Sequence, residues 1–347
     1  TTSSTTLHQC TGVNIWTVVL RSKALPQPNR FFCVNAERFL NGVKMDNLLF
    51  VYFGTRDYHF LIRKNIELLQ RLYPNADVLV YDWGDENGRP SNSTFQSGVE
   101  VVSWSNRISD TMELLDPLGV DGLNELARAF NSRERTSVKR RFNKFFLKKF
   151  PGSGPARAVL DRAMRYENLL LHKCYALGDC ARRVGERPFL FLDADAYLVE
   201  NLDVVYEGAP DVIMPSLEPE KQLWEPNRCH ALSDGIMGFG ANVIARTVFL
   251  DEWYKSLAAN TEKLRVIASL SRMVEERVRG TKDNVLDSWR IGTVDFNGTP
   301  VKIRTIPNHI YNSVLNYEYD GGDLESVKVL HLSGVAQNQE LFERFIA

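Results

Sequence analysis

The chain has 347 residues, of which 44% are hydrophobic and 24% charged, and its formal net charge at pH 7 is −1. This composition is typical of a globular protein with one large domain or two smaller ones, and it argues against a strongly basic nucleic-acid-binding domain. No stretch of the sequence approaches the roughly 18 consecutive apolar residues of a membrane span. The five cysteines are odd in number and lack zinc-ribbon or CxxC spacing, which favours a reducing compartment over a disulfide framework.

The chain opens at Thr1 with the polar run TTSSTT. Such an opening is consistent with a removed leader or membrane anchor. We therefore leave the compartment open. The cysteine pattern favours the cytoplasm, and a Golgi or secretory lumen is the alternative if an anchor was removed.

The next part of the chain predicts strands alternating with a helix. The apolar run 48–53, LLFVYF, predicts a buried strand, and 59–74, HFLIRKNIELLQRLYP, has apolar residues at helical spacing. Further strands are predicted at 76–84, ADVLVYDWG, and at 98–104, GVEVVSW. This alternation predicts a parallel sheet with helices on its faces.

Residues 105–157 interrupt that alternation. Within them, 133–150 reads RERTSVKRRFNKFFLKKF and has eight Lys or Arg against one Glu, interleaved with phenylalanines. A packed amphipathic helix with a solvated basic face is the commonest structure for such a pattern. The alternatives are peripheral contact with an anionic membrane surface and binding of an acidic acceptor.

The second half of the chain predicts a further series of elements. A long helix at 156–184 leads into the apolar run that begins at Phe189. The elements predicted after that run are a strand at 211–216, a strand and turn at 235–245, a helix at 246–257, two more helices, and strands at 301–307 and 328–334.

Two aspartates directly follow the most apolar of these strands. Residues 187–203 read RPFLFLDADAYLVENLD, so that Asp193 and Asp195 come at the end of the run Phe189–Leu192. If the chain is extended there, residues i and i+2 share a face, and the carboxyl ends of parallel strands are where open sheets bind ligands. Two neighbouring carboxylates repel each other unless a cation lies between them, and hard oxygen ligands suit Mg²⁺ or Mn²⁺. A D-x-D motif alone arises easily by chance, so its position after a buried strand carries the prediction.

The order of several segments resembles that of D-x-D-containing glycosyltransferases of the GT-A fold. After the long helix, FLFLDADAYLVENLD resembles their D-x-D segment, LSDGIMGFGANVIARTVFLDEW their small-residue segment, and TKDNVLDSW their short acidic motif. IRTIPNHIYN and VLHLSG resemble the closing strands of the glycogenin-type enzymes of glycosyltransferase family 8. There the His–x–x–Gly motif normally continues with Lys-Pro-Trp, whereas here Gly334 is followed by VAQNQ. The resemblance covers about residues 48–335.

The resemblance implies a fold, a domain organisation and an activity. The implied fold is a GT-A, nucleotide-diphospho-sugar transferase α/β domain, with a Rossmann-like, mostly parallel sheet, flanking helices and a helical insertion at about 105–157. The domain spans 47–347 and follows an N-terminal extension at 1–46. The implied activity is metal-dependent transfer of a sugar, in the hexosyltransferase class EC 2.4, from a nucleoside-diphosphate sugar. A UDP-sugar is favoured as donor, Mn²⁺ or Mg²⁺ as cofactor, and the hydroxyl acceptor is a glycan, a lipid-linked sugar or a protein.

The resemblance also implies roles for particular residues. Asp193, Asp195 and His331 would bind the metal, with Asp193 and Gly334 also at the donor. Lys173, and with it Arg165 eight residues earlier on the same helix, would meet the diphosphate. Asp283 would face the reacting sugar, although it could equally be a helix N-cap.

The remaining candidates come from their positions at strand ends. Asp57 could bond a ribose hydroxyl, Tyr58 could stack on a base, and Asp82 ends the next strand; turn-forming or structural roles are equally open for them. Ser233, Asp234 and Gly235 precede a glycine-rich strand, where glycine would permit close approach of a sugar. Asp234 joins Asp283 as a catalytic candidate.

Three other functions are compatible with parts of the pattern. In haloacid-dehalogenase-type phosphohydrolases the first Asp of a D-x-D is the nucleophile, but that strand lies near the start of the domain. Here nearly 190 residues precede it, and Tyr197 occupies a position where Thr or Val is common. A sugar-nucleotide-forming nucleotidyltransferase would need a glycine-rich phosphate loop near its start, which we do not find. A non-catalytic, transferase-like binding domain is the third alternative.

Overall fold

The computed structural model describes residues 47–84, 95–104, 137–218, 223–225, 228–260, 265–278, 285–287, 289–314 and 326–331, with scattered residues between 122 and 131. The predicted N-terminal extension and the part of the predicted insertion at 105–121 lie outside these ranges. The predicted domain boundaries therefore stay predictions.

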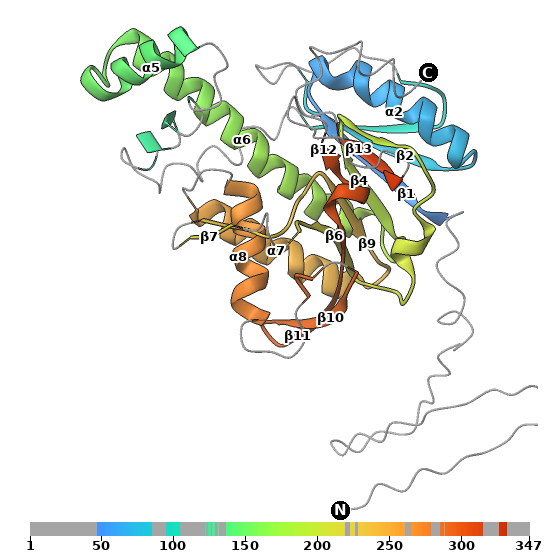
Figure 1. Ribbon diagram of the computed structural model, residues 1–347. Helices are drawn as coiled ribbons and strands as arrows, with labels where there is room; N and C mark the ends of the chain where they lie inside the picture. Colours follow the sequence, from blue (N-terminus) through green and yellow to red (C-terminus); the bar gives the residue numbers. More distant parts are fainter. Residues whose placement is uncertain are drawn as a thin grey trace, which may run out of the picture.

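Within these ranges, a central eight-stranded sheet has the order β10-β11-β6-β9-β4-β1-β2-β3 (Figure 1). Its strands are β1 Leu49–Gly54, β2 Asp77–Asp82, β3 Val99–Ser103, β4 Phe189–Asp193, β6 Val212–Ser216, β9 Ile236–Phe239, β10 Ile291–Phe296 and β11 Thr299–Pro307. β1 pairs in parallel with β2 and β4, β2 with β3, and β6 with β11. β9 is antiparallel to both β4 and β6, and β10 is antiparallel to β11. All strands except β9 and β10 thus run in one direction, which confirms the predicted Rossmann-like, mostly parallel sheet.

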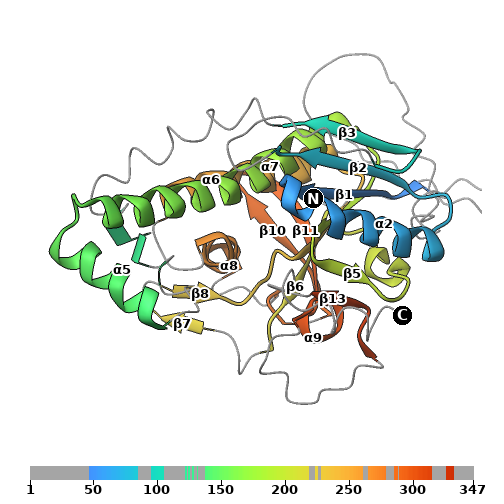
Figure 2. The same ribbon diagram turned by 90° about the horizontal axis from the view of Figure 1, so that it is seen from above.

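Helices cover both faces of this sheet. They are α2 His59–Leu72 on one face and α6 Gly154–Arg183, α7 Val243–Ala259 and α8 Arg265–Val278 on the other (Figure 2). Phe50 and Leu190 point to the α2 side and pack with its Ile62, whereas Val51 and Phe191 point to the side of α6. Because both faces are buried, the central strands read as continuous apolar runs instead of alternating ones. Of the helices that the structure describes, none combines the length and the hydropathy needed to cross a bilayer.

A small second sheet lies beside the carboxyl end of β4. It has the order β12-β13-β5, with β5 Ala196–Leu198, β12 Ser313–Val314 and β13 Val329–His331. The short helix α9 Asn308–Tyr311 leads from β11 into β12. Strand β5 starts directly after the D-x-D motif. Because β13 pairs with β5, the end of β13 lies next to that motif.

The basic segment contains a helix, α5 Ser137–Lys149, which packs against the start of α6 at the end remote from the sheet (Figures 1 and 2). Leu147 is buried with Val159 and Ala163 of α6, as expected for an amphipathic helix. The rest of α5 exposes the predicted basic side chains and, beyond the prediction, several large apolar ones.

The region after α8 also differs from its prediction. The helix start predicted at Asp283 lies outside the described residues. After it, Val285 and Leu286 form a turn rather than a helix, and the chain enters β10 at Ile291. The strand predicted at 301–307 is β11, but its hairpin partner β10 was missed. Asn297 and Gly298 connect the two with φ angles of 56° and 84°. An Asn-Gly pair in this left-handed region is a strong hairpin signal, which was present in the sequence.

Candidate metal centre

The D-x-D motif forms a tight turn, not an extended strand. Asp193 is the last residue of β4, Ala194 and Asp195 form the turn, and β5 follows. Two hydrogen bonds hold this turn in place: the side-chain amide of Asn65 on α2 donates to the Ala194 carbonyl at 2.9 Å, and Asp193 N donates to the Gly235 carbonyl at 2.9 Å. The two carboxylates therefore lie close together because of a turn, where the sequence suggested the alternation of a strand.

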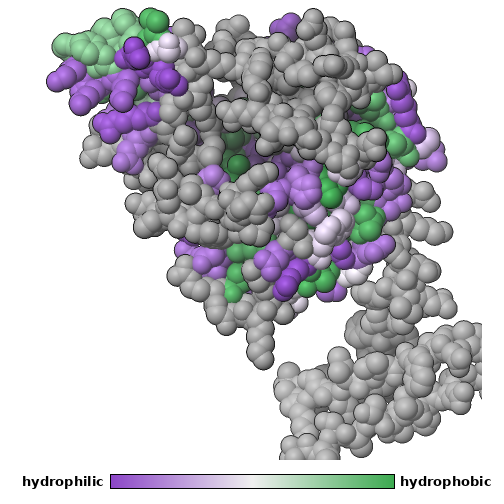
Figure 3. Space-filling view, in the orientation of Figure 1, coloured by the Kyte–Doolittle hydropathy of each residue, from purple (hydrophilic) through white to green (hydrophobic). Residues whose placement is uncertain are grey.

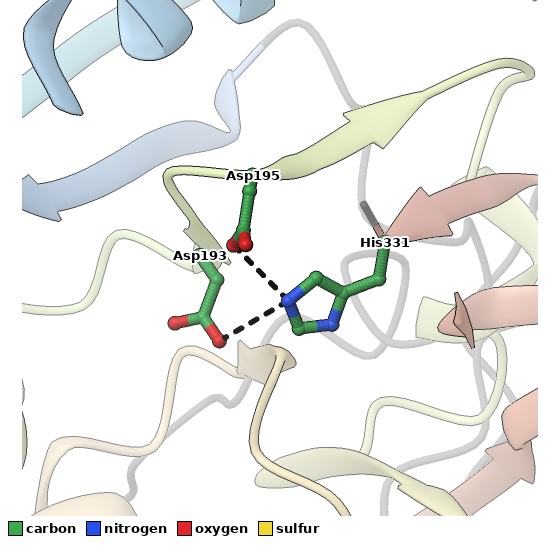
Figure 4. Close-up of side chains that lie close together, drawn as sticks. All are labelled: Asp193, Asp195 and His331. Carbon is green, nitrogen blue, oxygen red and sulfur yellow. Dashed lines mark hydrogen bonds and ion pairs between the residues drawn. The ribbon is translucent and has the colours of Figure 1, made fainter. Parts of the chain in front are cut away.

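His331 joins the two carboxylates through strand pairing. β13 runs antiparallel to β5, and His331 pairs with Ala196, the residue after Asp195. As a result His331 Nε2 lies 3.1 Å from Asp195 Oδ1 and 3.8 Å from Asp193 Oδ2 (Figure 4). One ligand atom from each of these three residues lies within 4.8 Å of the other two.

The other nitrogen of His331 is held by Asn312. The amide nitrogen of Asn312 donates to Ser233 Oγ at 2.9 Å and to Asn308 Oδ1 at 3.0 Å, so its oxygen is left to accept from His331 Nδ1 at 3.0 Å. Burial would lower the pKa of His331, but the Asp195 carboxylate outweighs it and raises that pKa, so that Nε2 also carries a proton and donates to Asp195 Oδ1. A bound cation would replace that proton and take the lone pair of Nε2. Metal-binding histidines are oriented by such a hydrogen bond on the remote nitrogen.

Lys173 brings a positive charge to the opposite side of the cluster. Its buried ammonium donates to Asp193 Oδ1 at 2.7 Å, Asp234 Oδ2 at 2.8 Å and the Asp234 carbonyl at 2.9 Å. Burial alone would lower the pKa of Lys173, but the two carboxylates outweigh it and raise that pKa, so the lysine stays charged. All three N–H donors of the ammonium thus have partners within the protein. The predicted contact of Lys173 with a diphosphate is not tested and stays a prediction.

The charge of the cluster favours a cation. Burial, together with the Asp234 and Asp195 carboxylates, raises the pKa of Asp193 to about 6 in spite of Lys173 and His331. At Asp195 burial acts in the same upward direction, but the hydrogen bond and charge of His331 outweigh it and lower the pKa. Three carboxylates thus face one ammonium and one imidazole. Two carboxylates and an imidazole are a donor set suited to Mn²⁺, and with a hydrated shell to Mg²⁺, so these residues fit the predicted metal.

Gly235 leaves room for the histidine. A Cβ at this position would lie 2.7 Å from His331 Nδ1 and 2.8 Å from His331 Cε1, and closer still to the Asn312 side-chain oxygen. The absence of a side chain at Gly235 thus lets His331 and Asn312 approach the backbone closely, and the predicted contact of Gly235 with a sugar stays a prediction.

We expect Gly235→Ala to lower the free energy of unfolding by about 1–3 kcal/mol, the usual cost of overpacking, because His331 and Asn312 would both have to move. Urea unfolding measures this change. Gly152→Ala is the matched control, since a Cβ there meets nothing within 4 Å. Equal stability of the two variants would show that the pair can shift without cost.

Two other predicted residues lie at the rim of the cluster. Asp57 and Tyr58 belong to a short 3-10 turn, Arg56–Tyr58, directly after β1, and both side chains are exposed. A Cβ on Gly54 would lie 3.2 Å from Tyr58 Cβ and 3.8 Å from Ala194 Cβ, so Tyr58 starts beside the D-x-D turn. Partial burial and the nearby Asp195 carboxylate raise the pKa of Tyr58. The turn that follows β1 thus presents exposed side chains near the cluster.

The remaining predicted residues lie elsewhere. Asp82 is buried at the end of β2, where its carboxylate accepts from Gly84 N at 2.8 Å and lies 3.2 Å from His59 Nε2. Arg165 is exposed on α6, two helical turns or about 12 Å along the axis from Lys173. Asp283 and Gly334 lie outside the described residues.

Sequence reasoning missed two residues that support the site. Asn65 could have been found, because it interrupts the apolar face of α2 between Ile62, Ile66 and Leu69, and a buried amide needs partners. Asn312 gave no such signal. Its role depends on the pairing of β12 with β13, which no local pattern indicates.

No protein-family model and no curated protein matches the sequence. The chain is similar to solved structures, among them the apo structure of the WbbM bifunctional glycosyltransferase, with 9% sequence identity and a TM-score of 0.43. The similarity covers 85% of this chain and 47% of WbbM, so the chain spans less than half the length of that protein. A likeness this distant identifies no activity.

Proposed function

We propose that this protein is a glycosyltransferase that moves a sugar from a nucleoside-diphosphate sugar, with a UDP-sugar favoured, to a hydroxyl acceptor. Asp193, Asp195 and His331 would hold a divalent cation, Mn²⁺ or Mg²⁺. The observation that carries the proposal is the convergence of these three side chains at the carboxyl end of β4. Beside it lies the end of β1, and ligands of open α/β sheets bind at this edge.

The proposed reaction requires stabilisation of negative charge and a site that is already ordered. Cleavage of the anomeric bond develops negative charge on the leaving diphosphate, and a bound divalent cation would supply the compensating charge. The protein keeps the ligands in position beforehand: Lys173 holds Asp193, and Asn312 orients the ring of His331. A rigid, preformed site is more effective than one that must reorganise during the reaction.

The donor would lie between the cluster and the turn after β1. Tyr58 is exposed there and could stack on a base, while Asp57 could accept a hydrogen bond from a ribose hydroxyl. Asp234 is held by Lys173 and is mostly buried, so that it would contact the sugar only at the inner end of the site. For Asp283 we retain the role implied by the resemblance, a contact with the reacting sugar.

Calorimetry of UDP and GDP binding, with Mn²⁺ and with chelator, tests the proposal directly. We expect the preferred nucleoside diphosphate to bind at least tenfold more tightly with Mn²⁺, because a cation held by Asp193, Asp195 and His331 would supply positive charge for the phosphates. The unphosphorylated nucleoside is the control and should show no metal dependence. A screen of nucleotide sugars for slow, Mn²⁺-dependent hydrolysis then identifies the sugar.

The same assays separate the alternatives. Hydrolysis of p-nitrophenyl phosphate without any nucleotide-sugar hydrolysis would favour a phosphohydrolase. Absence of both activities, with no metal-dependent nucleotide binding, would favour a non-catalytic binding domain and sink the proposal.

A further inference from the structure

Helix α5 presents an outward face of large apolar side chains. Val138, Phe142 and Phe145 are spaced four and three residues apart, so they share one face of the helix. Their exposed fractions are 74%, 53% and 50%, and Phe150, just after the helix, is 53% exposed. Figure 3 shows a hydrophobic area at the position of α5, bordered by hydrophilic residues. Scattered exposed apolar residues are normal, but a contiguous patch of this kind marks an interaction surface.

The aromatic rings of the patch contact one another. Phe146 lies 4.6 Å from Phe142, 5.5 Å from Phe145 and 6.0 Å from Phe150 between ring centroids. The opposite face of α5, with Asn143 and Leu147, is the one buried against the rest of the protein. Packing of α5 onto α6 therefore does not account for the exposed rings.

Positive charge surrounds this apolar stripe. The exposed basic residues of α5 are Lys139, Arg140, Arg141, Lys144, Lys148 and Lys149. No acidic residue occurs between Ser137 and Phe150. Arg141 and Lys148 are seven residues apart and lie along one border of the stripe, and Lys139 lies on the other side of it.

We propose that α5 binds the surface of an anionic membrane, with its phenylalanines in the headgroup boundary and its basic side chains at the lipid phosphates. Such a surface offers both negative charge and an apolar layer at shallow depth, which is what an amphipathic helix with aromatic and basic residues matches. An acidic protein partner would need a complementary apolar patch of its own as well as its charge. The lipid surface is therefore the occupant that the observed charge and apolar area favour.

This surface is separate from the metal centre. Lys173, which contacts the cluster, is 10 residues from Ala163, the residue of the α5–α6 cluster that is closest to it in sequence, or about 15 Å along the helix axis. That separation exceeds the Debye length of about 8 Å at physiological salt, so we expect substitutions of the exposed α5 side chains to change membrane binding with little effect on the cluster. The inference stands whether or not the proposed transferase activity is correct.

Co-sedimentation with vesicles tests it. We expect the protein to bind vesicles of phosphatidylcholine with one third phosphatidylglycerol at least tenfold more strongly than vesicles of phosphatidylcholine alone, with binding weakened by added salt. Arg141→Glu with Lys148→Glu should reduce the partition coefficient at least about thirtyfold, since each basic residue near the surface is worth about fivefold and each reversal also adds a repelled negative charge. Phe142→Ser should reduce it about tenfold through lost apolar burial.

The chain offers matched controls on α2. Lys64→Glu with Arg71→Glu reverses two exposed charges at the same seven-residue spacing, and Phe60→Ser removes a ring that is 49% exposed. Both should bind vesicles as the unaltered protein does, and thermal unfolding checks that every variant is folded. Equal loss in the α2 and α5 variants would overturn the proposal. So would α5-dependent retention on immobilised poly-glutamate without vesicle binding, which would identify an acidic protein as the partner.

Discussion

Asp195→Ala is expected to abolish Mn²⁺-dependent hydrolysis of a nucleotide sugar and to lower Mn²⁺-dependent nucleotide affinity by at least a hundredfold. The substitution removes one of two carboxylates in the proposed ligand set and also the hydrogen-bond partner of His331 Nε2. Ligands and the groups that orient them each typically contribute tenfold to a hundredfold to metal affinity. Calorimetry with Mn²⁺ and a donor-hydrolysis assay measure the two effects.

The control for this variant is Asp161→Ala, which removes an exposed carboxylate from α6. It should retain both nucleotide binding and hydrolysis. Thermal unfolding of Asp195→Ala distinguishes loss of metal binding from loss of the fold. If a folded Asp195→Ala protein still binds nucleotide tightly and in a metal-dependent way, Asp195 is not a ligand and the proposed centre is misassigned.

Lys173→Met is expected to lower the free energy of unfolding by about 3 kcal/mol. Methionine matches much of the length and volume of lysine but has no charge, so Asp193 and Asp234 would lose their shared partner inside the protein. Removing one member of a buried ion pair leaves an uncompensated charge, which costs far more than losing a surface pair. Urea unfolding at neutral pH, in the presence of chelator, measures the loss.

A surface pair provides the comparison. Lys255 is exposed and forms an ion pair with Glu252 at 2.8 Å, similar in length to the pairs of Lys173. Lys255→Met should leave the free energy of unfolding nearly unchanged. Adding Asp234→Asn to Lys173→Met should recover part of the loss, because one unpaired carboxylate is removed. A loss below about 1 kcal/mol in Lys173→Met would mean that the carboxylates are satisfied without the lysine.

Most of the central sheet could be predicted from the chain. The runs LLFVYF and FLFL are apolar throughout because β1 and β4 are covered by helices on both faces, and this burial leaves a direct mark on composition. Helix α2 has its apolar residues on one side because only that side packs against the sheet. Strand β10 was missed because it is an edge strand of the sheet and largely exposed, so that its apolar pattern is correspondingly weak.

The sequence by itself determined the two carboxylates at the end of a buried strand, since Asp193 and Asp195 are neighbours along the chain and the strand that carries them is a local feature. Their arrangement with His331, Lys173 and Asn312 was decided only by the tertiary structure. His331 and Asp195 are 136 residues apart and meet because β13 pairs with β5 in one particular register. A shift of that register by one residue would turn His331 to the other face of its strand, and nothing in the local sequence specifies which register forms. Only the packing of the complete sheet brings the carboxylates, the imidazole and the ammonium to one place.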